Sequence, residues 1–153
     1  MMMRSYQNPV YGKYFADPCV WKHEGKYYAA GTGLMRTVKD ISESGLSGAN
    51  TEGDRAIPLL TSDDFVTWKS AGGALRVSEK YIEKAFWAPE IAYEDGWFYM
   101  YYSTAKVGLL HQIRVAKSKN PTGPYEDVAF LIGATDDCPF AIDAHPFRDD
   151  DGQ

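Results

Sequence analysis

The stretch Ala141-Ile142-Asp143-Ala144-His145-Pro146-Phe147-Arg148-Asp149-Asp150-Asp151-Gly152 decides the fold, because its layout occurs three times in the chain. It places one carboxylate, Asp143, before a short segment that ends in an acidic glycine turn. The same layout occurs at Asp17–Gly25 and, with alanine in the aspartate position, at Ala88–Gly96. The three units begin at residues 17, 88 and 143, so their spacings are 71 and 55 residues. Repeats of this size, built from short strands, are typical of β-propeller blades.

The composition indicates one globular domain over residues 1–153, because a chain of this length buries a single core. Eleven Tyr, seven Phe and four Trp favour β-structure and are the residues that stack on sugar rings. The net charge of −5 argues against a nucleic-acid partner. No apolar run approaches the ~20 residues of a membrane span, so no membrane partner is expected. The first residues show no apolar signal segment, which predicts a cytoplasmic location, or secretion if a leader was trimmed.

The spacing of turn signals predicts an all-β chain with about two and a half blades. The first blade is expected over about 17–75, the second over about 87–133, and the start of a third over about 141–153. A hairpin is expected around Glu24-Gly25. The other predicted elements are a loop at 42–56, one or two helical turns at 78–86, and strands at 57–61, 66–70, 90–93, 97–103, 111–118 and 128–132.

Two cysteines, Cys19 and Cys138, are too few for a disulfide framework and are predicted to be free, buried thiols. The spacing of His, Cys and Asp residues shows no metal-binding cluster, so no metal site and no cofactor are expected.

Asp17 and Asp143 occupy matching positions of two repeats. Matching strand ends of a propeller converge on one end of its axis, so the two carboxylates are expected to face a common cleft. Paired carboxylates in a concave site suit general acid–base hydrolysis. The alternative is that each aspartate only caps a turn, as aspartate often does.

Several motifs make the chain resemble glycoside hydrolase family 43. They are Tyr14-Phe15-Ala16-Asp17-Pro18, Thr61-Ser62-Asp63-Asp64-Phe65 leading to Trp68, Phe86-Trp87-Ala88-Pro89-Glu90, and Ile142-Asp143 followed by Phe147, Asp149 and Asp151-Gly152. The resemblance implies a five-bladed β-propeller, of which this chain is the N-terminal half. It also implies inverting hydrolysis of xylose- or arabinose-containing oligosaccharides or polysaccharides, by β-xylosidases, α-L-arabinofuranosidases or arabinanases.

Carried over residue by residue, the resemblance makes Asp17 the general base and Asp143 the carboxylate that orients the acid and raises the acid's pKa. Phe86, Trp87 and Ile142 would contact the sugar, although core packing between blades is an alternative for the two aromatics. The acid of the family is a glutamate in a later blade, so residues 1–153 alone are expected to be inactive. Glu90 is expected to have a structural role or to support the catalytic residues from beside them. A calcium ion is possible only in the complete propeller.

Other interpretations stay open. His145, two residues after Asp143, is expected to be structural, with contact to the site as the alternative. A related fructosidase family is less similar because Phe147-Arg148-Asp149 is followed by Asp150 rather than proline. The chain could also be a sugar-binding half-propeller without turnover, or a structural fragment that needs a partner. Open strand edges predict a homodimer or a complex with a complementary C-terminal half.

Overall fold

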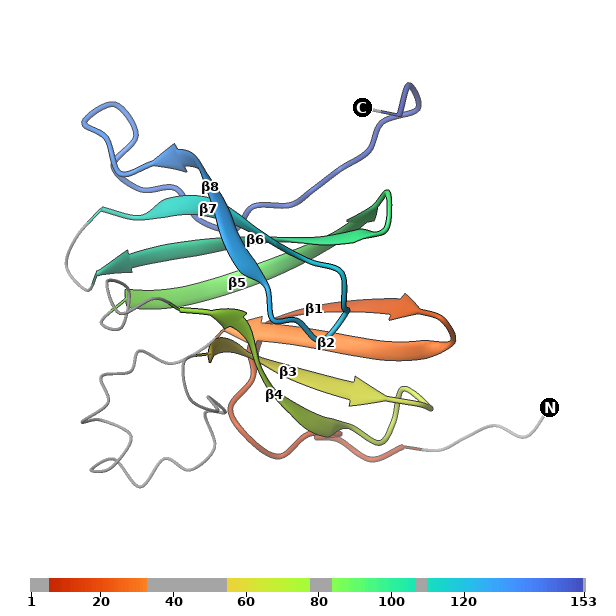
Figure 1. Cartoon of the computed structure of the whole chain (residues 1–153). Coiled ribbons are helices and arrows are strands. Elements are labelled where there is room, and N and C mark those ends of the chain that lie inside the picture. Colours follow the sequence, from red (N-terminus) through yellow and green to blue (C-terminus); the bar gives the residue numbers. More distant parts are fainter. Residues whose placement is uncertain (1–5, 33–54, 78–83, 107–109, 153) are drawn as a thin grey trace.

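The computed structural model describes residues 6–32, 55–77, 84–106 and 110–152, which form two four-stranded antiparallel sheets (Figure 1). The first sheet consists of β1 (Ala16–His23), β2 (Lys26–Thr32), β3 (Arg55–Ser62) and β4 (Lys69–Arg76). The second consists of β5 (Lys84–Glu94), β6 (Trp97–Lys106), β7 (Gln112–Ser118) and β8 (Glu126–Gly133). Each sheet takes its strands in chain order. The all-β prediction is confirmed, and the described residues contain no helix of the length and apolarity needed to cross a membrane.

The first two strands of each sheet form hairpins with the same turn. Glu24 and Gly25 join β1 to β2 with φ values of 47° and 81°, and Asp95 and Gly96 join β5 to β6 with 48° and 77°. Left-handed backbone at both turn residues is the type I′ geometry, whose twist matches that of the flanking strands. The hairpin predicted around Glu24-Gly25 is therefore confirmed.

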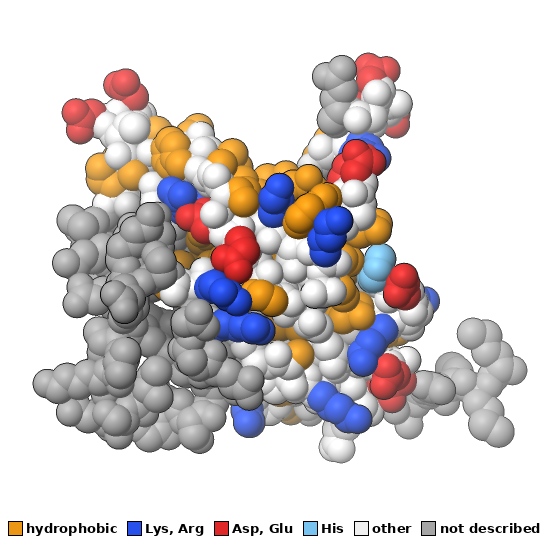
Figure 2. All heavy atoms as spheres, in the orientation of Figure 1, with side chains coloured by type: hydrophobic (Ala, Val, Ile, Leu, Met, Phe, Trp, Pro, Cys, Tyr) orange, Lys and Arg blue, Asp and Glu red, His pale blue; other side chains and the backbone are white. Residues whose placement is uncertain are grey.

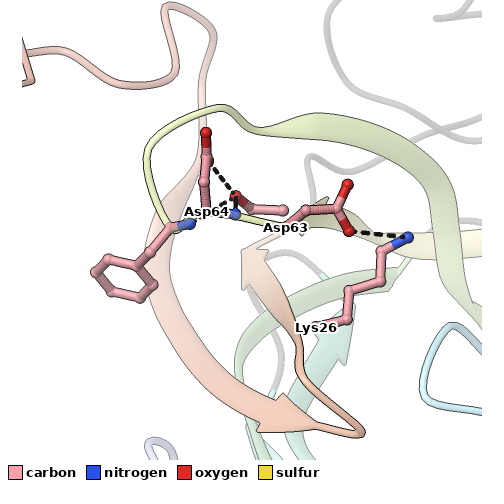
Figure 3. A network of polar contacts seen from close by, with 5 residues as sticks. Lys26, Asp63 and Asp64 are labelled. Atoms are coloured by element: carbon pink, nitrogen blue, oxygen red, sulfur yellow. Dashed lines mark hydrogen bonds and ion pairs between the residues drawn. The ribbon is translucent and has the colours of Figure 1, made fainter. Parts of the chain in front are cut away.

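The turn between β3 and β4 is longer than the sequence predicted, so β4 begins at Lys69 rather than at residue 66. The Asp64 carboxylate accepts hydrogen bonds from the backbone N–H groups of Val66 (2.9 Å) and Thr67 (2.7 Å). These bonds lower the pKa of Asp64 because they favour the charged carboxylate. Beside it, Asp63 lies 3.8 Å from the Lys26 ammonium in an ion pair across the turn (Figure 3). Backbone groups that bond to Asp64 are not available to a strand ladder, which delays the start of β4.

Two other local predictions need correction. Residues 84–86 belong to β5, not to the helical turns expected over 78–86, and residues 78–83 lie outside the described residues. Residues 55–56 belong to β3 and not to the loop expected over 42–56, whose other residues also lie outside the described part. In both places, pairing with a strand distant in sequence outweighs the local signal.

The hydrophobic core lies between the two sheets. The first sheet contributes alanines and branched aliphatic side chains and the second mostly larger ones, all of them buried: Ala30, Ala56, Ile57, Leu59, Ala74 and Leu75 from the first, and Phe86, Phe98, Met100, Tyr102 and Ala116 from the second, with Tyr125 from the segment before β8. Small residues on one face make room for rings from the other, as dense packing requires. In this arrangement β5 packs beside β1 and β2, so the two innermost strands are neighbours.

A second junction joins the outer strands. Tyr125, which is fully buried, forms a parallel bridge with Leu75, donates its backbone N–H to the Ala74 carbonyl (2.8 Å) and accepts from the Arg76 N–H (2.9 Å). Its hydroxyl donates to the Pro121 carbonyl at 3.1 Å. The two sheets are thus held at both the inner and the outer strands.

Hydrophobic side chains remain exposed on the second sheet. Figure 2 shows orange side chains gathered in the upper part of the view, where β7 and β8 lie in Figure 1. The exposed apolar residues of β8 are Val128, Phe130, Leu131 and Ile132. In a propeller, apolar faces of this kind are covered by the next blade.

Candidate active site

A cavity of about 290 Å³ lies where the three repeat units begin. Its lining residues are Asp17, Pro18, Ala88, Glu90, Asp143, Ala144 and His145. The structure therefore brings Asp17 and Asp143 to one cavity, together with the alanine that replaces aspartate in the second unit. Both aspartates are exposed to solvent, as groups that meet a dissolved substrate must be.

At this cavity the three repeat units share a backbone conformation as well as a sequence pattern. Asp17, Ala88 and Asp143 all have left-handed backbone, with φ values of 46°, 42° and 60°. In the first two units a proline follows, and the pairing register of β1 and β5 shifts there in a β-bulge. A bulge bends the strand and redirects a side chain, and it is over-represented next to active sites. The local chain thus turns one side chain per unit toward the cavity.

A buried hydroxyl on the second strand of each sheet binds the left-handed residue of the next repeat unit. Thr32 ends β2, is 6% exposed, and accepts a hydrogen bond from the Ala88 N–H at 3.0 Å. Ser103 of β6 is fully buried and accepts from the Asp143 N–H at 3.0 Å. Each hydroxyl therefore holds the backbone of the next repeat unit at its left-handed residue.

Thr32 also contacts a candidate catalytic residue. Its hydroxyl donates to Oδ2 of Asp17. A hydrogen bond to an ionised carboxylate is roughly twice as strong as one between neutral groups. This bond orients the Asp17 carboxylate within the cavity.

Glu90, the third carboxylate of the cavity, is engaged by other side chains. Its Oε2 lies 3.6 Å from Nδ1 of His145, and the Cys19 thiol packs against it from β1. Burial raises the pKa of Cys19 to about 12, and the nearby Glu90 charge adds to this rise while a backbone hydrogen bond at Ile91 opposes it. Cys19 is thus a neutral structural thiol. Both cysteines are free as predicted, but Cys138 is half-buried rather than buried.

The aromatic residues expected to contact sugar lie elsewhere. Phe86 is 5% exposed and belongs to the core between the sheets, which is the alternative that the sequence left open. Trp87 is half-buried and packs against the His111 ring, with 4.5 Å between ring centroids. Neither residue lines the 290 Å³ cavity, and neither does Ile142. Contact between sugar and Trp87 or Ile142 stays a prediction.

A larger cavity of about 790 Å³ lies on the first sheet; it shares Pro18 with the smaller cavity, but no aspartate lines it. Its walls come from residues 6–15 and from apolar side chains of the first sheet and its β3–β4 turn, including Val20, Leu60 and Trp68. Lys13 is the charged residue among its lining residues, so no acid–base pair is present there. The smaller, carboxylate-lined cavity is therefore the candidate active site. Among the described residues, no group of three or more His, Cys, Asp or Glu is placed to hold a metal ion.

Sequence reasoning missed Thr32 and Ser103, although a signal for them exists. Thr32 follows Asp17 by 15 residues, and Ser103 follows Ala88 by the same number. In the sheets, Thr32 pairs with Ala16 and Ser103 pairs with Trp87, so both stand opposite the residue before the left-handed position. Aligning the second strands of the two repeats would have identified the matched hydroxyls.

Two four-stranded sheets packed side by side, with two aspartates from matching repeat positions at one cavity, define a partial β-propeller of the glycosidase class. The sequence model of glycosyl hydrolases family 43 matches residues 6–153, and the chain belongs to this family. It is 32% identical over 162 residues to the β-D-galactofuranosidase xynD of Aspergillus niger, and 33% identical over 140 residues to the xylosidase/arabinosidase 43A of Humicola insolens. A crystal structure of a thermostable family-43 glycoside hydrolase matches with 30% identity and a TM-score of 0.69, over 97% of this chain and 42% of that one.

The alignments with the two curated relatives include 95% and 91% of this chain. They include 42% and 41% of the relatives' own lengths, so the chain spans less than half of each.

Proposed function

We propose that the protein containing this chain is an inverting glycosidase that acts on xylose- or arabinose-containing oligosaccharides or polysaccharides. The observation that supports this most strongly is the common cavity of Asp17 and Asp143, reached from matching positions of two repeats. The substrate class is supported by the xylosidase/arabinosidase activity in the name of the Humicola insolens relative.

Asp17 is assigned as the general base that removes a proton from the attacking water. Its carboxylate is exposed at the cavity, and one of its oxygens is held by Thr32. Asp143 is assigned as the carboxylate that orients the acid and, as a nearby like charge, keeps that acid protonated at working pH. Inverting enzymes place acid and base roughly 6.5–9.5 Å apart, which leaves room for the water.

The acid itself is assigned to a glutamate beyond the Asp143 motif, as the family resemblance implies. Glu90 is the other carboxylate of the cavity, but its carboxylate already interacts with His145 and Cys19. A general acid must reach the leaving-group oxygen with its proton. The structural role predicted for Glu90 agrees with these contacts.

The test uses the product of the longest reading frame that contains this chain, with nitrophenyl β-D-xylopyranoside, α-L-arabinofuranoside and β-D-galactofuranoside as substrates. Proton NMR during turnover reports the anomer first released. We expect cleavage of the xyloside or arabinofuranoside with inverted configuration. Retained configuration would contradict the base role of Asp17, and cleavage of the galactofuranoside alone would contradict the substrate class. Saturable binding of xylo- or arabino-oligosaccharides without any turnover would instead support a sugar-binding protein.

A further inference from the structure

The hydroxyl of Thr32 forms two hydrogen bonds, and the direction of each is fixed by its partner. The Ala88 N–H can only donate, so the Thr32 oxygen accepts at 3.0 Å. An ionised carboxylate can only accept, so the single hydroxyl hydrogen goes to Oδ2 of Asp17. Thr32 therefore connects the Asp17 carboxylate of the first sheet to the backbone of the second sheet.

Ser103 shows which of the two bonds is specific to Asp17. It stands at the matching position of β6 and accepts from the Asp143 N–H in the same way. The residue that corresponds to Asp17 in its own repeat is Ala88, which has a methyl group in place of a carboxylate. The bond to the next repeat is thus common to both sheets, whereas the bond to a carboxylate occurs in the first sheet.

We propose that Thr32 is a positioning residue, whose hydroxyl sets the orientation of the Asp17 carboxylate and makes that orientation depend on the packing of the second sheet against the first. Its position suits this role, because Thr32 is buried at the end of β2, the strand paired with β1 on one side and β3 on the other. Asp17 itself lies in a bulge, where the backbone pairing is interrupted. Strand pairing therefore holds its side chain less firmly there. This inference rests on the proposed base role of Asp17.

The expected effect is on turnover more than on substrate binding. A small misplacement of a catalytic group can reduce a rate by about 10²-fold. Replacing Thr32 with valine keeps its shape but removes the donor to Asp17 and the acceptor for Ala88. We expect T32V to lower kcat about 10- to 100-fold with KM changed less than about twofold, since the variant alters the geometry of the base.

T32S and T104V are the matched variants. T32S retains the hydroxyl and is expected to keep kcat within about threefold of the parent. Thr104 is buried on β6, and its hydroxyl oxygen has no hydrogen-bond partner among the described residues. T104V makes the same chemical change at similar burial and is expected to keep the parental kcat.

Kinetics and crystal structures of the parent, T32V, T32S and T104V are compared in the longest reading-frame product. The proposal expects the Asp17 carboxylate to be rotated or disordered in T32V alone. It is overturned if that carboxylate keeps its parental position in T32V, or if T32V lowers only the melting temperature and not kcat per folded enzyme. If the parent shows no hydrolysis, the proposed function fails, but the carboxylate position still decides the positioning role. If T32V does not fold, T32C replaces it, because a thiol is a weak donor, and the same two outcomes decide.

Discussion

The first and second sheets present the same backbone to the cavity but different chemistry. Each has a left-handed residue, a following proline, a bulge in the innermost strand, and a hydroxyl 15 residues later. In the first sheet the left-handed residue is Asp17, and in the second it is Ala88. The comparison teaches that the repeated backbone determines where a side chain reaches the cavity. The identity of the left-handed residue in each unit, aspartate or alanine, determines whether that side chain can take part in catalysis.

The largest expected effect comes from making the first unit resemble the second. Asp17→Asn keeps the size of the side chain but removes its charge, and general bases contribute about 10²–10⁴-fold to rates. We expect kcat to fall by that factor in the longest reading-frame product, measured with the preferred nitrophenyl glycoside. Asp136→Asn, an exposed turn residue of the same type, is the control and should leave kcat unchanged. Equal losses in both variants would show that the cavity does not single out Asp17.

The faces that pack between the sheets differ in a second way. The first sheet contributes Ala30, Ala56 and Ala74, whereas the second contributes Phe86, Phe98 and Tyr102. Rings from one sheet fill the space that small residues leave on the other, so the two faces are complementary and not interchangeable.

Removing a ring from the second sheet should cost the most stability. Phe98 is 1% exposed and contacts the rings of His23 and Tyr93, with centroid distances of 4.8 and 4.7 Å. Phe98→Ala is expected to lower the free energy of unfolding by about 3–5 kcal/mol, because it leaves a cavity. Urea denaturation measures this, with Phe147→Ala as the control. Phe147 is 79% exposed, so a comparable loss there would mean that exposure does not decide the effect.

Adding volume to the first sheet should cost less. Ala30 is fully buried and paired with Cys19 and Leu59, so a leucine there has to displace its neighbours. Ala30→Leu is expected to lower the free energy of unfolding by about 1–3 kcal/mol in the same urea assay. Ala129→Leu, at a half-buried position of β8 outside the core cluster, is the control. If A30L were neutral, the small residues of the first sheet would not be a packing requirement.

Local signals in the sequence were sufficient for the hairpin at Glu24-Gly25 and for bringing Asp17 and Asp143 to one cavity. Glu24-Gly25 determines its own turn, and matched aspartates reach one cavity because repeats place equivalent residues alike. The start of β4 could not be predicted, because it depends on which backbone groups the Asp64 carboxylate binds. Residues 84–86 were assigned to the wrong element because their strand is formed by pairing with residues 104–106.

Side-chain roles were harder to predict than strands. An aromatic residue next to a catalytic motif can stack on sugar or fill the core, and composition does not separate the two. The structure places Phe86 in the core between the sheets, where it is 5% exposed. Thr32 carries no motif of its own, and its role depends on a contact to Ala88, 56 residues away in the chain.

The smallest expected effect tests whether the backbone of the second sheet repeats that of the first. Ala88 has a φ of 42°, a region that costs a residue with a Cβ roughly 1–2 kcal/mol, whereas aspartate enters it more readily. Ala88→Gly relieves this strain. It also gives the unfolded chain more conformational freedom, which lowers the free energy of unfolding by about 0.5–1 kcal/mol. We therefore expect the free energy of unfolding to rise by up to about 1 kcal/mol in urea denaturation. The hydrogen bond from the backbone N–H of residue 88 to Thr32 should be retained. Ala85→Gly on the same strand, where φ is not positive, should instead lower it by roughly 1 kcal/mol. Equal losses in both variants would mean that position 88 is not strained, and that the two sheets share the sequence pattern without sharing its backbone.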